Sequence, residues 1–341
     1  MKVLVLTQAI DLDDPVLGVY AHLIEEIAKK CKHMTVICLK QGRHSMPGNV
    51  SVYSLGKETG RSRLKYIFRF YTYLWTTRRE YSTVFVHMNS EYVCMGGLLW
   101  RLWGKRIVLW RNHRTEDLYT WFAVHFAHAV CYTSPSAYVA RFKHAVRMPV
   151  GIDTSVFIPG TTSAPLQSIL FFGRLDEVKH PGAFLQAIER LSGKGIKMEV
   201  DVIGDPTLGR EAYANDLKKR FQHMLDVSFE KAVPNEQAPA LYRAHAIYVN
   251  LTPSGSFDKT IAEAAASGCI IVAANEVLHG IVPDALMVDP LSAEDVARGI
   301  EAALKLASNE RAALSKNLRD YVIREHSLAL LVHRLMPVLR A

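Results

Sequence analysis

The stretch from Ser254 to Gly268, SGSFDKTIAEAAASG, combines small polar residues with a helix pattern. It follows the apolar run AIYVNLTP, which is typical of a buried strand, and its Ala-rich second half ends at Gly268, a typical helix stop. A helix that begins after a strand presents free backbone N–H groups and the positive end of its dipole. We therefore expect an anion to bind where this helix begins, at Ser256, Phe257, Asp258 and Lys259; a helix cap with nothing bound is the alternative.

A second group of residues has the chemistry to bind phosphate. The segment FFGRLDEVKHPG places Gly173 and Arg174 at the end of a strand pattern and Lys179 just before a helix pattern. An arginine can bind phosphate oxygens with two parallel N–H bonds, and a lysine adds a point charge. Glu263, one turn inside the Ala-rich helix, can accept hydrogen bonds from ribose hydroxyls. Solvated surface charges are the alternative for all three side chains.

Alternating strand and helix patterns must position these residues. Short apolar runs separated by helix patterns fill residues 1–150, and the same alternation resumes at residue 168. The short run ALMVDP (285–290) continues it as an expected strand before the next helix pattern. Such alternation predicts an α/β fold with parallel sheets covered on both faces. The segment VGIDTSVFIPGTTSAPLQ interrupts the rhythm with Gly, Pro, Ser and Thr, so we place the domain boundary there, at 152/153. Open sheets of this kind bind ligands at the carboxyl ends of their strands.

The composition sets limits on class and location. The chain has 341 residues, 22% of them charged, and five cysteines without a CxxC pair, which indicates a cytoplasmic protein with reduced thiols. The start, MKVLVLTQAIDLDD, is interpreted as a strand and not a signal peptide, and no stretch approaches a membrane span. Residues 1–150 carry 21 Lys and Arg against 10 Asp and Glu, whereas the remainder carries 20 against 23. The first half is therefore expected to meet something acidic.

These motifs together resemble a known family. The C-terminal half is similar to the retaining, GT-B-fold glycosyltransferases of family 4, in which a GR…K segment is followed by a strand ending in PS and by a motif of the form E-G-F-G-x-x-x-x-E-A-x-x-x-G. Here Pro253-Ser254 is followed by Gly255-Ser256-Phe257-Asp258, Glu263-Ala264 and Gly268, and GIDTSVFIP (151–159) matches the family's junction motif. The resemblance is strong from about 145 to 275 and looser before that.

The resemblance implies a GT-B fold, with two Rossmann-like doubly wound domains facing across a cleft. Residues 1–152 would form the acceptor domain, onto which a last helix of about 325–341 packs back, and 153–324 the nucleotide-sugar donor domain. Arg174 and Lys179 would hold the donor diphosphate, Glu263 the ribose, and the backbone at Phe257 and Asp258 the phosphate or sugar. Further residues expected near the donor are the catalytic histidine His113, which ends the strand pattern RIVLWRNH, and Gly18, Gly173 and Gly204.

One position departs from the family pattern. Family members have a glutamate eight residues before the one that corresponds to Glu263, whereas this chain has Gly255 there. We expect Asp258 to substitute for the missing carboxylate; loss of catalysis is the alternative. No metal site is expected, because DLD (11–13) lies in a first strand–helix loop, and His125 and His128 have no third ligand. No cofactor is expected beyond the nucleoside-diphosphate sugar, which is a co-substrate.

A basic aromatic segment points to a second partner. RSRLKYIFRFYTYLWTTRR (61–79) carries six Lys or Arg, several aromatic residues and no acid. An amphipathic helix packed on the sheet is one interpretation, and a face that rests on anionic lipid headgroups at the inner membrane face is the other. Nucleic acid is not expected, because the aromatic residues follow a helix pattern instead of lining a sheet.

The sequence therefore predicts a metal-independent, retaining hexosyltransferase. It would move a sugar from a UDP- or GDP-linked donor to a hydroxyl of a lipid-linked or polysaccharide acceptor in cell-envelope polysaccharide biosynthesis. Two alternatives stay open, a non-catalytic nucleotide-sugar-binding protein and a GT-B-fold epimerase.

Overall fold

The computed structural model describes residues 1–14, 17–60, 62–115, 117–253 and 257–341. The chain forms two compact units. The N-terminal unit comprises Met1–Gly151 and Leu328–Ala341, and the C-terminal unit comprises Ile152–Ser327. Each unit contains one sheet whose strands are all parallel, so the predicted α/β class is confirmed.

The sheet of the N-terminal unit has seven strands in the order β3-β2-β1-β4-β5-β6-β7. The first strand is central, and the chain adds strands first on one side of it and then on the other, so the order reverses between β1 and β4. The strands are β1 (Lys2–Ile10), β2 (His33–Gln41), β3 (Val50–Ser54), β4 (Thr83–His87), β5 (Arg106–Trp110), β6 (Ala129–Tyr132) and β7 (Ala145–Arg147).

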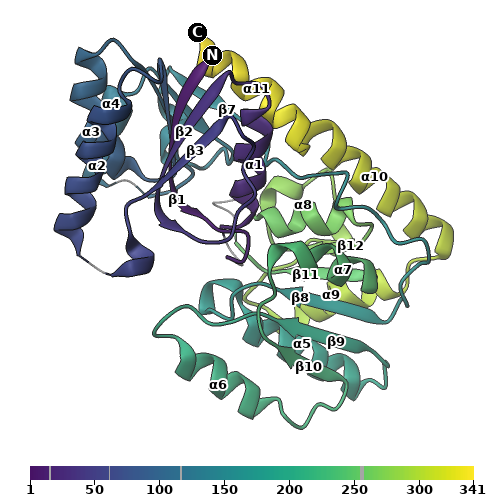
Figure 1. Ribbon diagram of the computed structural model, residues 1–341. Coiled ribbons are helices and arrows are strands. Elements are labelled where there is room, and N and C mark those ends of the chain that lie inside the picture. The colour runs from purple at the N-terminus through teal and green to yellow at the C-terminus, as the bar shows by residue number, and fades with distance from the viewer. Residues whose placement is uncertain (15–16, 61, 116, 254–256) are drawn as a thin grey trace. The chain divides into compact units, whose positions relative to one another are not determined.

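Helices cover both faces of this sheet because both faces of its strands are apolar. On one face α1 (Val19–Ala28) and α11 (Leu328–Arg340) pack against each other and the sheet, as Figure 1 shows for the purple and yellow ends of the chain. On the other face lie α2 (Arg63–Thr77), α3 (Ser90–Leu102) and α4 (Leu118–Phe126). Capping side chains fix two of these helix starts: Ser62 accepts from Lys65 N, and Asp117 from Thr120 N.

The sheet of the C-terminal unit has five strands in the order β10-β9-β8-β11-β12. Its first strand is again central, so the order reverses between β8 and β11, the position at which such sheets bind ligands. The strands are β8 (Ser168–Phe172), β9 (Glu199–Ile203), β10 (Val227–Glu230), β11 (Ile247–Asn250) and β12 (Ile270–Ala273). The helices are α5 (Pro181–Gly193), α6 (Glu211–Arg220), α7 (Ala238–Ala244), α8 (Lys259–Ala266), α9 (Ala293–Leu304) and α10 (Ser308–His326).

One expected strand is absent. The run ALMVDP (285–290) forms a short 3₁₀ turn, Asp284–Leu286, and a single bridge between Ala273 and Met287. Prolines at 283 and 290 flank the run, and proline cannot donate a ladder hydrogen bond, which explains why no strand extends there.

Candidate functional site

Lys179 is held between the carboxyl ends of β8 and β11, the strands where the order of the C-terminal sheet reverses. It lies in a 3₁₀ turn after β8, and its Nζ donates to Thr252 Oγ1, just past β11, at 2.9 Å. The same ammonium forms an ion pair with Asp258. Both side chains are largely buried, with 16% and 12% exposed. The predicted phosphate-binding lysine therefore lies at the expected edge of its sheet, already paired with a carboxylate.

Asp258 is the N-cap of α8 and the centre of a hydrogen-bond network. Its Oδ1 accepts from the backbone N and the hydroxyl of Thr260 at 3.2 and 2.9 Å, and its Oδ2 accepts from Asn250 at 3.1 Å and from Thr252 at 3.0 Å. Burial opposes ionisation of this carboxyl, but the Lys179 ammonium and the hydrogen bonds outweigh it and hold its pKa far below its usual value. Asp258 is thus an ionised group that positions Lys179.

A second charged pair follows along α8. Glu263 is 3% exposed, accepts a hydrogen bond from the Tyr242 hydroxyl at 3.2 Å, and lies 3.9 Å from Lys259 Nζ. Burial raises the pKa of Glu263 and lowers that of Lys259, and each charge opposes the shift of the other. Lys259 stands in the first turn of α8, where the helix dipole is unfavourable to a cation. A bound anion at this end of α8 would relieve that cost.

Arg174 is the most accessible cation of the predicted set. Its side chain is 51% exposed and its Nη1 lies 3.6 Å from Asp176. Burial favours the neutral form of Asp176, but hydrogen bonds from Thr207 and the charge of Arg174 outweigh it and lower its pKa. Arg174 thus lies two residues after the end of β8, with a side chain that is half exposed to solvent.

Of the two predicted glycines of this region, Gly204 is required by close packing and Gly173 by its backbone angle. A Cβ at Gly204, which has φ +155°, would lie 1.8 Å from the carbonyl oxygen of Gly173, so no larger residue fits. Gly173 itself has φ +157°, and nothing lies near the position of its Cβ. The glycines let the loops after β8 and β9 approach each other closely.

The remaining predicted residues of this unit are placed only in part. The Phe257 ring stacks on His326, with ring centroids 4.9 Å apart. Ser256 and Gly255 lie outside the described residues, so the predicted anion contact of Ser256 stays a prediction. The predicted residues are contacted by Asn250 and Thr252, at the end of β11, and by Tyr242, in α7. No pattern in the sequence marked these three residues.

Two predicted residues belong to the N-terminal unit. His113 follows β5 at the carboxyl edge of its sheet and has an exposed side chain. Gly18 precedes α1, and a Cβ there would lie 2.7 Å from the carbonyl oxygen of Asp14, so the backbone packs too closely for another residue. Their contact with a donor or acceptor stays a prediction.

The residues weighed as metal ligands have other partners. Asp11 forms an ion pair with Lys40 at 2.9 Å, and Asp13 one with Arg43 at 2.7 Å. His128 Nδ1 accepts from the backbone N of Ile107. Within the described ranges, no group of three or more His, Cys, Asp or Glu is arranged to hold a metal ion.

The N-terminal unit exposes an apolar surface that the sequence indicated only in part. Five large apolar side chains of α2 are exposed, and others of α3 and α4 extend the surface. Contacts join the three helices: the Tyr71 hydroxyl donates to Met95 O at 3.1 Å, and Cys94 Sγ to Tyr119 O at 3.2 Å. We call this the α2–α4 surface, made of Leu64, Ile67, Phe68, Tyr71, Trp75, Leu98, Leu102, Leu118, Tyr119, Trp121 and Phe122. None of the helices described is long and apolar enough to span a membrane.

Comparisons with known proteins identify one family model and a set of similar solved structures. The family model of glycosyl transferases group 1 matches residues 167–306, the region that holds Arg174, Lys179, Asp258 and Glu263. No curated protein matches the chain.

Solved structures match over nearly the whole chain at low identity. The HepE protein of Anabaena in complex with UDP and glucose matches with 16% identity, a TM-score of 0.79, and 100% of both chains covered. Sucrose-phosphate synthase of Thermosynechococcus elongatus matches with 17% identity and a TM-score of 0.78, covering 100% of this chain and 98% of that one. The α,α-trehalose-phosphate synthase of Burkholderia xenovorans, in complex with glucose-6-phosphate, matches with 13% identity and a TM-score of 0.70, covering 99% and 100%.

The fold prediction is thereby confirmed. The chain has the α/β fold of GT-B glycosyltransferase structures, with two Rossmann-like domains, and residues 167–306 are similar to glycosyl transferases group 1.

Proposed function

We propose that this protein is a metal-independent, retaining glycosyltransferase that takes its sugar from a nucleoside-diphosphate donor. The strongest support is the cationic edge of the C-terminal sheet, where Lys179 is held by Thr252 and Asp258 at the reversal between β8 and β11. Parallel α/β sheets bind nucleotides at this position. The group 1 family match over 167–306 covers the same residues. Because the related HepE structures contain UDP and UDP-glucose, a UDP-linked donor is the first candidate and a GDP-linked one the second.

In this proposal the protein's own cations do the work that a metal ion does in other transferases. The Arg174 guanidinium, the Lys179 ammonium and the amino end of α8 stabilise the diphosphate as it leaves. Glu263, buried beside Tyr242, holds the ribose hydroxyls. Asp258 holds the Lys179 side chain in place, and His113 of the N-terminal unit hydrogen-bonds the transferred sugar.

Turnover in EDTA tests this proposal. Purified protein is incubated with UDP-, GDP-, ADP- and TDP-sugars, and free nucleoside diphosphate and the sugar product are measured. We expect slow release from one donor, with the sugar otherwise unchanged and the anomeric configuration retained. Binding of a donor without any turnover, with or without added saccharide and lipid-linked acceptors, would favour the non-catalytic alternative, and conversion of the sugar to its epimer would favour the epimerase.

We further propose that the acceptor is lipid-linked and that the enzyme attaches peripherally to an anionic cytoplasmic membrane face through α2. The α2–α4 surface supports this, because aromatic and Leu side chains that stay 40–81% exposed are unusual on a monomer. Four exposed cations, Arg63, Lys65, Arg69 and Arg79, lie on or beside α2. Aromatic side chains at the headgroup boundary with cations at the phosphates are typical of interfacial helices. Flotation with anionic liposomes tests this attachment.

A further inference from the structure

A pocket of about 290 Å³ lies at the opposite edge of the C-terminal sheet from Lys179. It is lined by the loop before β8, the residues that lead into β11 and β12, and the first two turns of α10. α8 runs between the two edges: its N-cap Asp258 contacts Lys179, and its C-cap Ser267 lines the pocket. The pocket and the proposed donor site are therefore separate parts of the same unit.

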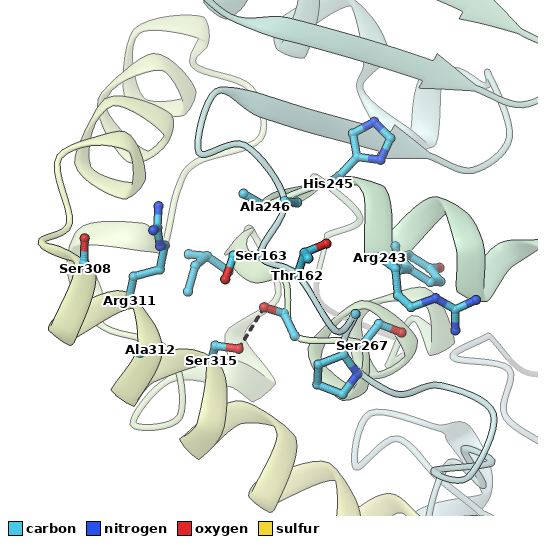
Figure 2. A pocket seen from close by; sticks show the side chains of 16 residues that line it. Thr162, Ser163, Arg243, His245, Ala246, Ser267, Ser308, Arg311, Ala312 and Ser315 are labelled. Atoms are coloured by element: carbon cyan, nitrogen blue, oxygen red, sulfur yellow. Dashed lines mark hydrogen bonds between the residues drawn. The ribbon is translucent and has the colours of Figure 1, made fainter.

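Two cations line this pocket without partners. Arg243, at the end of α7, and Arg311, in the first turn of α10, have no ion-pair or hydrogen-bond acceptor for their guanidinium groups in the part of the chain that the structure describes. Figure 2 shows them on opposite sides of the pocket. No Asp or Glu is among the lining residues. Unpaired arginines around an acid-free pocket favour an anion that bears phosphate or carboxylate oxygens.

Hydroxyl groups fill the space between the two arginines. The pocket is lined by Thr162, Ser163, Ser267, Ser308 and Ser315. Of these hydroxyls, only that of Ser315 has a hydrogen-bond partner among the described residues, the carbonyl oxygen of Gly268 at 2.8 Å (Figure 2). A hydroxyl can both donate to and accept from another hydroxyl, so such a lining suits a polyol.

Ser267 supplies an independent indication of a ligand. The residue is 3% exposed, and its Oγ is buried without a hydrogen-bond partner among the described residues. Buried polar atoms nearly always have a partner, and leaving one without a partner is destabilising. A small movement of the Ser267 side chain toward a ligand oxygen in the pocket would satisfy this hydroxyl.

We propose that this pocket binds a small phosphorylated sugar. Arg243 and Arg311 bind the two ends of this molecule, one its phosphate and the other the polar groups at the opposite end. The hydroxyls between the arginines bind the sugar. Ligand pockets usually measure about 300–1,000 Å³, so this one, just below that range, suits a molecule the size of a hexose phosphate and is too small for a nucleotide sugar.

Calorimetric titration of the full chain with glucose 6-phosphate, inorganic phosphate and glucose tests the proposal without any need for turnover. We expect glucose 6-phosphate to bind more tightly than either fragment. Arg243→Ala and Arg311→Ala should each weaken that binding about 10- to 100-fold, the range for a hydrogen bond to a charged group. Arg190→Ala, which changes an exposed arginine of α5 that does not line the pocket, should leave it unchanged.

Ser267→Ala separates ligand binding from a structural role. Because the hydroxyl has no partner in the free protein, its removal should leave the free energy of unfolding unchanged or raised, while affinity for glucose 6-phosphate falls several-fold. The proposal is overturned if glucose 6-phosphate does not bind, if it binds no better than inorganic phosphate, or if the two arginine variants bind it as wild type does. Since none of these results depends on a nucleotide sugar, they leave the proposed transferase activity untouched.

Discussion

At the scale of single residues, the buried pair of Lys179 and Asp258 links stability to the proposed function. Removing two charges from water is costly, and the pair is stable only because Asn250, Thr252 and Thr260 also donate to the carboxylate. An apolar pair would serve folding as well. The presence of a charged pair here is explained if the protein needs the Lys179 ammonium as a positioned cation for phosphate.

Asp258→Asn should lower the free energy of unfolding by about 3–5 kcal/mol at neutral pH, because Lys179 loses its counter-charge in a buried site. The folded-state pKa of Asp258 is depressed, so its contribution is present above the unfolded pKa, about 4, and is lost as pH falls toward the folded pKa. Denaturant unfolding should thus show a constant gap between wild type and variant from pH 7 to 5 that narrows below about pH 4. A gap that widens in acid would contradict the ionised state assigned to Asp258.

The sequence identified the charged members of this site but not their partners. Arg174 and Lys179 follow one strand pattern, and Asp258 and Glu263 lie in another segment. Their residue types and their order along the chain were enough to predict them as site residues. Thr252 and Tyr242 could not be chosen from the many other polar residues of the chain, because their contacts depend on which elements are neighbours in the fold and on the register of the strands.

At the scale of elements, the sequence of α2 predicts a helix but does not determine which face of that helix is buried. Aromatic and apolar residues occur all around this helix, and the structure buries Phe70, Leu74 and Thr77 against the sheet. The remaining apolar side chains, Phe68 and Trp75 among them, point outward with 74% and 59% exposed. The part of the surface from α3 and α4 was not predicted, since it arises only when three separate helices lie on one sheet face (Figure 1).

Flotation with liposomes that contain anionic lipid should recover the protein in the lipid fraction at low salt and less of it at high salt. Exchanging Phe68 and Trp75 together for Ser should lower partitioning at least about tenfold, because each side chain contributes roughly 1.5–3 kcal/mol on leaving water. Both side chains are exposed, so folding should be unaffected.

Matched exposed leucines in the C-terminal unit provide the control for flotation. Leu208 and Leu225 are 93% and 97% exposed and lie far from α2 in the chain, so exchanging both for Ser should not change partitioning. If wild type stays in the lipid-free fraction at low salt, or if both double variants float alike, membrane attachment through α2 is wrong.

At the scale of the whole molecule, alternation of strand and helix patterns was enough to predict two parallel α/β sheets. The central strands are apolar runs such as KVLVLTQ and SILFFG, and their length and composition are typical of strands buried on both faces. The edge strands β3 and β7 escaped prediction, because VSVYS and AVR are short and only half-buried and carry little hydrophobic signal. The excess of positive charge in residues 1–150 agrees with an acidic partner for the N-terminal unit.

Binding of nucleoside diphosphates to the full chain tests the central claim most directly, because it needs neither an acceptor nor a catalytic step. In titration calorimetry with UDP and GDP, we expect one of them to bind without added metal. Arg174→Ala should weaken that binding about 10- to 100-fold, and the exposed arginine control Arg190→Ala should not. If neither nucleotide binds, or if Arg174→Ala binds as wild type does, the phosphate site assigned to the edge of β8 and β11 is contradicted.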